Sequence, residues 1–446
     1  MIINLSSEIV IFMNHIYFIG IGGIGVSALA RYYLAAGWQV SGSDAAQSEI
    51  TDDLKKRGAR IFIGQRAKNI GQTGLIVYSA AIKPENPELS AAISRSIKTL
   101  TYAQAVGELT KKYFTIAVAG SHGKSTTTAL IGLIMIKAGL DPTIIVGTKL
   151  KELDNSNFRL GQSKYLVLEA DEYARSFHNY FPKIAVLTNI DKEHLDIYKT
   201  LAGVLTGFRK YIGNVQSDGY IVANKEDQSI KKVLSYKLQD PSCKIVWYQR
   251  GNHELSIPGT HNQFNAEAAW QAVKLLGVKK SVAEKVFKSY SGAWRRLEKL
   301  EIKKSSKFQD TSSKIYSDYA HHPTEIKATL QALREKYPNK KLVCVFQPHQ
   351  QDRLNRLFRE FTTAFDAADK TILYPLYKVR GRDSTGKTSA DLAKAINKSN
   401  IIYADNFKEV LKLIGSDTVS GSVIVFMSAG DLDSRVRSFL RSDLLS

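Results

Sequence analysis

Cysteine is scarce in this sequence, and it contains no long apolar run. Only Cys243 and Cys344 occur in 446 residues, which argues against a disulfide framework and against a cysteine-ligated zinc site. The apolar stretch Ile9–Met13 is too short to span a bilayer, and no basic residue precedes it. It therefore predicts neither a membrane anchor nor a signal peptide. We expect a cytoplasmic protein with no membrane partner.

Acidic residues are also in deficit, since 62 lysines and arginines stand against 42 aspartates and glutamates and the formal net charge is +20. Such a balance suits anionic partners, among them nucleotides and nucleic acid. The basic residues are scattered, however, and no recognition helix, zinc finger or RNP-like pattern is present. We interpret most of the excess as solvated surface and expect no nucleic-acid partner.

A glycine turn between a strand and a helix is the central feature of the sequence. Tyr113–Ala119 predicts a buried strand, Gly120–Gly123 a tight turn, and the residues from Lys124 onward a helix. Backbone N–H groups and the helix dipole at such a turn bind phosphate. Lys124 can reach nucleotide β- and γ-phosphates, and the Ser125 hydroxyl can bind Mg²⁺. The general P-loop pattern needs glycine where Val118 stands, so a chance Gly-Lys-Ser turn is the alternative.

A second glycine-rich turn lies near the start of the chain. The strand His15–Ile19 is followed by Gly20–Gly25 in a G-x-G-x-x-G pattern, by a helix, and by a strand that leads into Asp44. Dinucleotide-binding turns have this arrangement, with the pyrophosphate at the helix N-terminus and an acidic residue about 20 positions further on. The glycines do not decide which nucleotide binds, and a turn used only for packing is the alternative.

Polar side chains follow three apolar strands in the middle of the chain. Ser125 follows the first, Glu169 comes directly after Tyr165–Leu168, and His194 follows Ile184–Leu187. Since parallel strands end at one edge of a sheet, we expect these three side chains to share one magnesium–nucleotide site. Histidine is a softer ligand than Mg²⁺ usually takes, so Mn²⁺ is expected to substitute. Taken singly, Glu169 also fits a helix N-terminal acidic run and His194 a lone loop histidine.

Strands and helices alternate along the whole chain, which predicts an α/β protein with three domains. We expect a Rossmann-like domain over residues 1–107 and a central P-loop-type ATPase domain with a mostly parallel sheet over residues 108–294. A second Rossmann-like domain is expected over residues 295–446. Arg295 and Arg296 fall at the second boundary, where an arginine can stabilise phosphate charge, although a solvated pair is the default interpretation.

Nine segments, in this order along the chain, resemble the Mur ligase family and are most similar to its alanine-adding members. They are FIGIGGIGVSALA, AGSHGKSTTT, EADEYARSF, LTNIDKEHLD, GTHNQFNAEAA, GAWRRLE, SDYAHHPTEI, VFQPHQQDR and MSAGD. The resemblance covers nearly the whole chain from Met13, and the shortened phosphate loop is the form that this family has.

The resemblance implies ATP-dependent amide bond formation in the synthesis of a peptidoglycan precursor. The γ-phosphoryl group of ATP would activate the carboxylate of UDP-N-acetylmuramate as an acyl phosphate, and the amine of L-alanine would displace phosphate. The protein positions three substrates and neutralises phosphoryl charge. ATP with Mg²⁺ is implied, and we expect a monomer or weak dimer. Preference for alanine over glycine or serine stays open.

The resemblance also assigns roles to individual residues, by number in this chain. The UDP-sugar is expected at Gly20, Gly22, Gly23, Ile24, Gly25, Ser27, Asp44 and Ser79. ATP is expected at Gly120, Ser121, His122, Gly123, Lys124, Ser125, Thr126, Asn262, Asn265, Arg296 and Asp318. The expected metal ligands are Ser125 and Glu169 for a first metal ion and His194 for a second, and the residues expected to line the amino-acid side are Tyr319, His321, His349 and Arg353. The expected catalytic residues are Lys124, Glu169, His194, Arg296 and His321.

Some assignments have alternatives. Asn262 and Asn265 lie three positions apart on one predicted helical face, which suits helix capping as well as the reading of a base edge. Gln350 follows His349 where the family usually has arginine, which removes a bidentate carboxylate clamp. We expect Arg353 or Arg356 to compensate for that loss.

Three other functions fit part of the sequence. A recycling ligase would join a murein peptide to the same sugar nucleotide, but the VFQPHQQDR segment favours the alanine-adding reaction. A nicotinamide dehydrogenase built on Gly20–Asp44 would leave the Lys124 loop unexplained. A basic nucleic-acid-binding ATPase would be stimulated by DNA or RNA.

Overall fold

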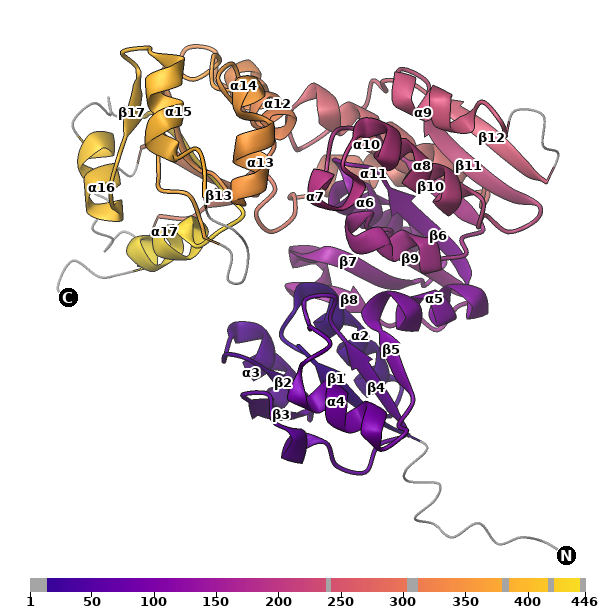
Figure 1. Cartoon of the computed structure of the whole chain (residues 1–446). Coiled ribbons are helices and arrows are strands. Elements are labelled where there is room, and N and C mark those ends of the chain that lie inside the picture. Colours follow the sequence, from indigo (N-terminus) through magenta and orange to yellow (C-terminus); the bar gives the residue numbers. More distant parts are fainter. Residues whose placement is uncertain (1–13, 238–241, 303–311, 379–384, 416–420, 442–446) are drawn as a thin grey trace, which may run out of the picture. The chain divides into compact units, whose positions relative to one another are not determined.

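The structure is a computed structural model that describes residues 14–237, 242–302, 312–378, 385–415 and 421–441 (Figure 1). The chain forms two compact units. The first contains Met1–Gln249 and Asn265–Val286, and the second contains Arg250–Phe264 and Phe287–Ser446. The two units are described separately below.

The first unit begins with a five-stranded parallel sheet in the order β3-β2-β1-β4-β5. Its strands are β1 (His15–Ile19), β2 (Gln39–Asp44), β3 (Arg60–Ile63), β4 (Leu75–Tyr78) and β5 (Thr99–Thr101). Its helices are α2 (Ile24–Ala35), α3 (Glu49–Lys56), α4 (Pro87–Ser94) and α5 (Tyr102–Lys112). Capping boxes at Ser48 and Thr101 fix the starts of α3 and α5.

A seven-stranded sheet follows in the same unit, in the order β12-β11-β10-β6-β9-β7-β8, and only β8 is antiparallel to its neighbour. Its strands are β6 (Phe114–Ala119), β7 (Thr143–Leu150), β8 (Ser156–Arg159), β9 (Tyr165–Glu169), β10 (Ile184–Leu187), β11 (Gly219–Asn224) and β12 (Cys243–Tyr248). Its helices are α6 (Lys124–Lys137), α7 (Leu195–Tyr198), α8 (Leu201–Ile212) and α9 (Gln228–Leu234). Helices α10 (Thr260–Lys274) and α11 (Lys280–Ser289) carry the chain between the units.

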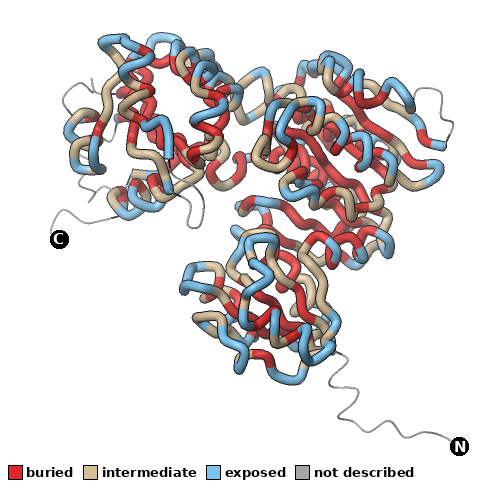
Figure 2. Tube along the Cα trace, in the orientation of Figure 1, coloured by how far each residue is buried: buried red, intermediate tan, exposed pale blue. Residues whose placement is uncertain are grey.

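One hydrophobic core runs through both sheets of the first unit. Ile16 and Phe18 of β1 belong to the same buried cluster as Leu166 and Leu168 of β9. Figure 2 shows the strands of this unit as mostly buried. The continuous core is the reason that the first two predicted domains lie in one compact unit. The predicted boundary near residue 107 stays a prediction.

The second unit holds a six-stranded sheet in the order β13-β14-β18-β15-β16-β17, in which only β13 pairs antiparallel. Its strands are β13 (Glu298–Leu300), β14 (Lys314–Asp318), β15 (Leu342–Gln347), β16 (Lys370–Leu373), β17 (Ile401–Tyr403) and β18 (Val423–Ser428). Its helices are α12 (Pro323–Lys336), α13 (Gln351–Arg356), α14 (Phe358–Phe361), α15 (Ser389–Ile396), α16 (Phe407–Gly415) and α17 (Leu432–Arg441).

Helices cover both faces of this third sheet. Along β15, Cys344 and Phe346 enter one buried cluster, while Val343 and Val345 enter another on the opposite face. Alternation between two apolar clusters is what a parallel strand covered on both sides requires. The predicted α/β class with mostly parallel sheets is therefore confirmed.

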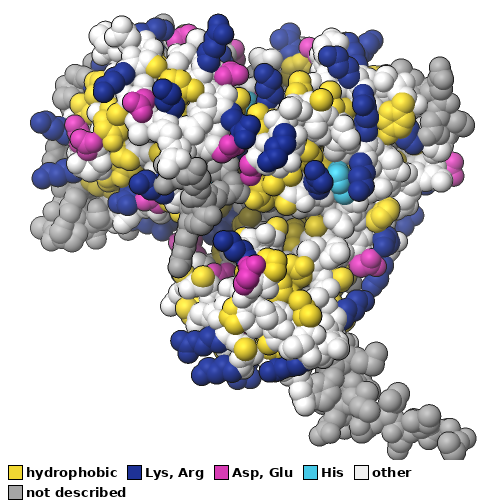
Figure 3. Space-filling view, viewed as in Figure 1, with side chains coloured by type: hydrophobic (Ala, Val, Ile, Leu, Met, Phe, Trp, Pro, Cys, Tyr) yellow, Lys and Arg dark blue, Asp and Glu magenta, His cyan; other side chains and the backbone are white. Residues whose placement is uncertain are grey.

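The surface agrees with the composition. Figure 3 shows lysine and arginine side chains spread over the face that it draws. Among the described helices, each is too short or too polar to cross a bilayer.

Candidate active site

The phosphate loop of the first unit connects β6 to α6, as predicted. Gly120 and Gly123 have φ angles of 144° and 83°, a region that favours glycine. A Cβ atom on Gly120 would lie 2.0 Å from Thr188 Oγ1, and one on Gly123 would lie 2.3 Å from Asn265 Oδ1. Both glycines are therefore required by conformation and by close approach of neighbouring side chains.

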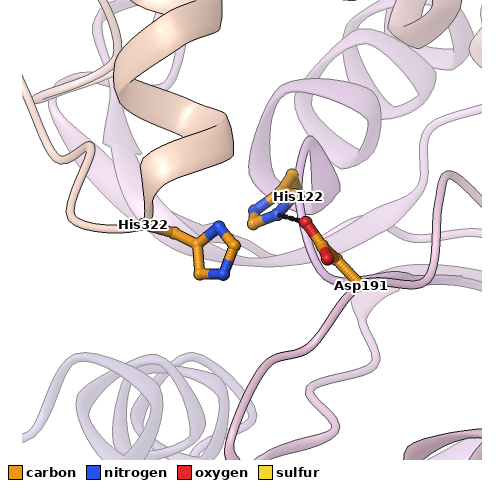
Figure 4. Close-up of side chains that lie close together, drawn as sticks. All are labelled: His122, Asp191 and His322. Atoms are coloured by element: carbon orange, nitrogen blue, oxygen red, sulfur yellow. Dashed lines mark hydrogen bonds and ion pairs between the residues drawn. The ribbon is translucent and has the colours of Figure 1, made fainter. Parts of the chain in front are cut away.

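Asn189, which follows β10, holds the loop in place. Its carbonyl oxygen accepts from Ser121 N at 3.0 Å, and its Oδ1 accepts from His122 N at 2.9 Å. Its Nδ2 donates to the His122 carbonyl at 2.9 Å. The His122 ring lies against Asp191, with Nε2 3.3 Å from Oδ2 (Figure 4). The loop is thus held by hydrogen bonds from the residues that follow β10.

Lys124 forms a buried ion pair that the sequence did not predict. Its Nζ donates to Glu172 Oε2 at 2.8 Å and to the Gly120 carbonyl at 2.6 Å, and Glu172 is 0% exposed. Burial by itself lowers the pKa of Lys124 and raises that of Glu172, but the attraction of Glu172 and Asp171 keeps the pKa of Lys124 above its usual value. The pKa of Glu172 is raised overall by burial, and we infer an ion pair from the 2.8 Å separation of Nζ and Oε2.

Glu172 belongs to a group of three residues that suits a cation. Ligand atoms of Asp171, Glu172 and His194 all lie within 4.8 Å of one another. Glu172 Oε1 and His194 Nδ1 are buried and have no hydrogen-bond partner in the described part of the chain. Two carboxylates are the oxygen donors that Mg²⁺ prefers, and the imidazole suits Mn²⁺ as well. These residues fit a divalent cation.

The three predicted metal ligands, Ser125, Glu169 and His194, have different neighbours in the structure. His194 lies 3.8 Å from Glu172, measured between Nε2 and Oε1. Glu169, at the end of β9, accepts from Gly147 N through Oε1 at 2.7 Å. Ser125 is buried in the first turn of α6. The shared metal site of Ser125, Glu169 and His194 stays a prediction, to which the structure adds Asp171 and Glu172.

The predicted base-reading asparagines on α10 have separate surroundings. Asn265 Oδ1 accepts from Thr127 Oγ1 of α6 at 3.4 Å and lies beside Gly123, so it belongs to the phosphate loop. Asn262 Nδ2 donates to the Pro258 carbonyl at 2.6 Å, a local contact, and both the base-reading and the capping interpretation of Asn262 stay predictions.

The second glycine turn lies at the carboxyl edge of the first sheet. Gly22 N donates to Asp44 Oδ2 at 2.8 Å, and a Cβ on Gly20 would lie 3.1 Å from the Cβ of Ser79. The strands β1, β2 and β4 thus bring the predicted UDP-sugar residues Gly20, Asp44 and Ser79 together. Ser27 is fully buried and donates to the Ile24 carbonyl at 2.9 Å.

A buried carboxylate behind this turn is also absent from the sequence-based prediction. Glu88 of α4 accepts from Ser43 Oγ at 2.5 Å, from Tyr17 Oη at 3.0 Å and from Asn69 Nδ2 at 2.7 Å. Its fully buried position next to Asp44's strand fixes the end of β2. Only its place in the Asn-Pro-Glu helix start could have drawn attention to it.

In the second unit, the ends of β14 and β13 bring Asp318 and Arg296 together. Asp318 accepts from Leu297 N and from Ala320 N, each at 2.7 Å. Burial raises the pKa of Asp318 to about 6, against the opposing effect of Arg296 and these two N–H groups. The Arg296 guanidinium carbon lies 5.2 Å from the centre of the Tyr319 ring.

Three of the residues predicted to bind the amino-acid substrate, Tyr319, His321 and His349, have neighbouring aromatic rings in the same unit. The His321 ring centre lies 5.2 Å from that of Tyr319 and 6.2 Å from that of His349. Tyr377, which was not predicted, stacks on His349 at 5.5 Å and 11°. His321 Nδ1 lies 3.3 Å from Glu325 Oε2. The structure therefore gathers Tyr319, His321 and His349 as expected.

Arg353 and Gln350 lie at the start of α13. Arg353 is buried in the first turns of that helix, whereas Arg356 is more exposed and pairs with Asp352 at 2.8 Å. Gln350 has a φ of 69°, unusual for a residue with a side chain. Of the two arginines expected to compensate, Arg353 is the one held inside the unit.

Comparison with known proteins finds three family models along the chain. They are "Mur ligase family, catalytic domain" over residues 15–114, "Mur ligase middle domain" over residues 118–268, and "Mur ligase, glutamate ligase domain" over residues 296–430.

Full-length relatives are also found. The UDP-N-acetylmuramate–L-alanine ligase of Aquifex aeolicus is 38% identical over 450 residues, which cover 95% of this chain and 97% of the relative. The enzyme of the same name from Acetivibrio thermocellus is 38% identical and covers 96% of each chain. A crystal structure of UDP-N-acetylmuramate-alanine ligase from Thermotoga maritima matches with a TM-score of 0.78 at 26% identity, over 96% of this chain and 98% of that one.

Proposed function

Because this chain belongs to the Mur ligase family, we propose that it is an ATP-dependent ligase that joins L-alanine to the carboxylate of UDP-N-acetylmuramate. The observation that carries the proposal is full-length similarity to ligases of that name at 38% identity. It agrees with two glycine turns in one unit, one of which leads into Lys124 and the other of which donates to Asp44 through Gly22 N. A peptide-adding ligase is the less supported alternative.

The reaction has two steps. A carboxylate oxygen of the sugar acid attacks the γ-phosphorus of ATP, the bond to the ADP oxygen breaks, and an acyl phosphate forms. The amine nitrogen of L-alanine then attacks the acyl carbon, phosphate leaves, and the amine loses a proton. Activation is needed because the negative charge of a carboxylate makes it a poor electrophile.

The proposed roles of the first unit's residues are those that the family resemblance implies. The Gly120–Gly123 turn and Lys124 bind and orient the triphosphate, and Asn265 supports the turn from the side. The Gly20–Gly25 turn, Asp44 and Ser79 bind the sugar nucleotide. Orientation of this kind supplies a large part of the rate enhancement in phosphoryl transfer.

A divalent cation, Mg²⁺ or Mn²⁺, would be held by Asp171, Glu172 and His194 together with the predicted ligands Ser125 and Glu169. Such a cation, when bound, neutralises phosphate charge. In the second unit, Arg296 and Asp318 remain the proposed contacts to ATP, and Tyr319, His321, His349 and Arg353 remain those of the amino-acid side. Domain limits near residues 107 and 294, a cytoplasmic location, a monomer or weak dimer, and the absence of nucleic-acid and membrane partners also remain proposals.

Phosphate release with ATP and UDP-N-acetylmuramate, to which amino acids are added one at a time, tests the function. We expect release only when L-alanine or a close analogue is present, and none from Lys124→Ala. Lys111→Ala is the matched control, because Lys111 is exposed, pairs with the exposed Glu108 and lies over the Phe181 ring. Release with a murein tripeptide but not with L-alanine would favour the recycling reaction instead.

A further inference from the structure

The antiparallel β7–β8 hairpin has no role in the function proposed so far. It forms the edge of the central sheet, and in Figure 1 it lies next to helix α2 of the first sheet. One side of it contacts the predicted metal ligand, since Gly147 N of β7 donates to Glu169 Oε1 at 2.7 Å. Its other side contacts the helix that follows the sugar-nucleotide turn.

Asn157 of β8 makes that second contact. Its side chain is 1% exposed. Its Nδ2 donates to the carbonyl of Ile24, the first residue of α2, at 2.6 Å, and its Oδ1 accepts from Arg31 Nη1 of the same helix at 2.6 Å. One amide group therefore uses both its donor and its acceptor on a single helix.

The contact belongs to a buried polar network that holds α2 at several points. Arg31 Nη1 also donates to Ser27 Oγ at 3.2 Å, and Arg31 Nη2 donates to Asp53 of α3 at 2.8 Å. Ser27 Oγ donates to the same Ile24 carbonyl at 2.9 Å. Buried networks in which each member has a partner define one geometry, because any shift leaves a polar group unsatisfied.

We propose that Asn157 is a positioning residue that fixes the sugar-nucleotide turn relative to the phosphate loop and Glu169. The hairpin links the two sites, because it is bonded to Ile24 at one place and to Glu169 at another. In the reaction proposed above, on which this inference rests, the sugar carboxylate must meet the γ-phosphorus. A misplacement of about 1 Å can cost about 100-fold in rate.

The substitution Asn157→Asp separates the two contacts of this side chain. A carboxylate keeps Arg31 as a partner and forms an ion pair with it, but it has no hydrogen to donate to the Ile24 carbonyl. Asn157→Ala removes both contacts. Glu49→Gln is the control, since Glu49 of α3 is 83% exposed and its pair with Lys149 of β7 at 3.4 Å is a surface contact between the same hairpin and a different helix.

We expect kcat to fall about 10- to 100-fold in both Asn157 variants, with the KM for ATP and the Kd for UDP-N-acetylmuramate changed by less than about threefold. The melting temperature should fall clearly only in Asn157→Ala. A purely structural role predicts instead that kcat follows the melting temperature. A kcat within about twofold of wild type in Asn157→Asp, or a loss confined to sugar-nucleotide affinity, would overturn the inference.

Hydrogen exchange provides a second readout that does not depend on the reaction. In Asn157→Asp, amide exchange should accelerate in the first turns of α2, from Ile24 to Arg31, and stay unchanged in α6. Unchanged exchange in α2 would count against the positioning role even if the wild-type protein showed no ligase activity. Failure of the proposed function alone would appear as an inactive wild-type protein with the exchange result intact.

Discussion

The ion pair between Lys124 and Glu172 makes stability and activity separable. Removal of the Lys124 charge, as in Lys124→Met, leaves the Glu172 carboxylate buried at 0% exposure without its ammonium partner. Addition of Glu172→Gln removes that uncompensated charge while keeping nearly the same volume. We therefore expect the single variant to be unstable and inactive, and the double variant to be stable and inactive.

The size of the effect follows from the burial of the pair. With Nζ and Oε2 at 2.8 Å and both side chains largely inside the protein, loss of one partner costs about 3–5 kcal/mol. For a domain of about 150–250 residues this lowers the melting temperature by about 6–20 °C. In the double variant, the fall in melting temperature should be less than about half of the fall in Lys124→Met. Removal of a charge that stabilises phosphoryl transfer lowers kcat about 10²–10³-fold in either variant.

Differential scanning calorimetry and phosphate release on four proteins provide the assay: wild type, each single variant and the double variant. Lys111→Met is the matched control, since the exposed pair of Lys111 and Glu108 contributes about 1 kcal/mol at most. If Lys124→Met melts at the wild-type temperature, or if the double variant melts no higher than Lys124→Met, the buried ion pair does not exist as described. If the double variant regains activity, Lys124 does not act on phosphate.

Three further outcomes are expected. The pKa of Asp318 is raised from 3.8 to about 6, so between these values the folded state binds more protons than the unfolded state. The free energy of unfolding should therefore fall by up to about 3 kcal/mol as the pH rises from about 4 to 6. In urea denaturation measurements, Asp318→Asn should lack this fall. Arg353→Ala should raise the KM for L-alanine about 10- to 100-fold through loss of a charged hydrogen bond, whereas Arg356→Ala should not; equal KM values in Arg353→Ala and wild type would remove Arg353 from the site. Chelation should abolish phosphate release and Mn²⁺ should restore it, and His194→Ala should need about 10- to 100-fold more metal for half-maximal activity; an unchanged metal requirement would exclude His194 as a ligand.

Much of the fold could be predicted from local sequence, because buried parallel strands are continuous apolar runs. His15–Ile19 and Ile184–Leu187 were predicted with the bounds that β1 and β10 have. The hairpin strand β8, Ser156–Arg159, was not predicted. It is short and polar, and Asn157 is buried only because α2, more than a hundred residues earlier, packs against it. Pairing of this kind is decided by tertiary contacts that no local pattern contains.

In the candidate site, too, some features could be predicted from local sequence and others could not. The phosphate loop was predictable because its glycines and Lys124 act within one turn and one strand–helix context. The partner of Lys124 was not predictable. The sequence Glu169-Ala170-Asp171-Glu172 contains three carboxylates, and the end of the predicted strand favours Glu169, the first of them. The chain turns sharply after β9, with left-handed φ values of 51° at Ala174 and 58° at Arg175. Glu172 lies three residues beyond the end of β9, and its contact with Lys124 is decided by tertiary structure that no local pattern contains.

The position of Glu172 also limits how ATP can bind. In the described structure the Lys124 ammonium group is already hydrogen-bonded to the Glu172 carboxylate. Phosphate oxygens of ATP must therefore replace Glu172 as the anionic partner of Lys124. Once displaced, Glu172 would be a buried carboxylate without compensation, which is costly. The cost is lowest if a cation neutralises it, and Asp171 and His194 supply the remaining ligands within 4.8 Å. Nucleotide and metal binding are therefore expected to be cooperative, because each removes a charge that the other would leave uncompensated.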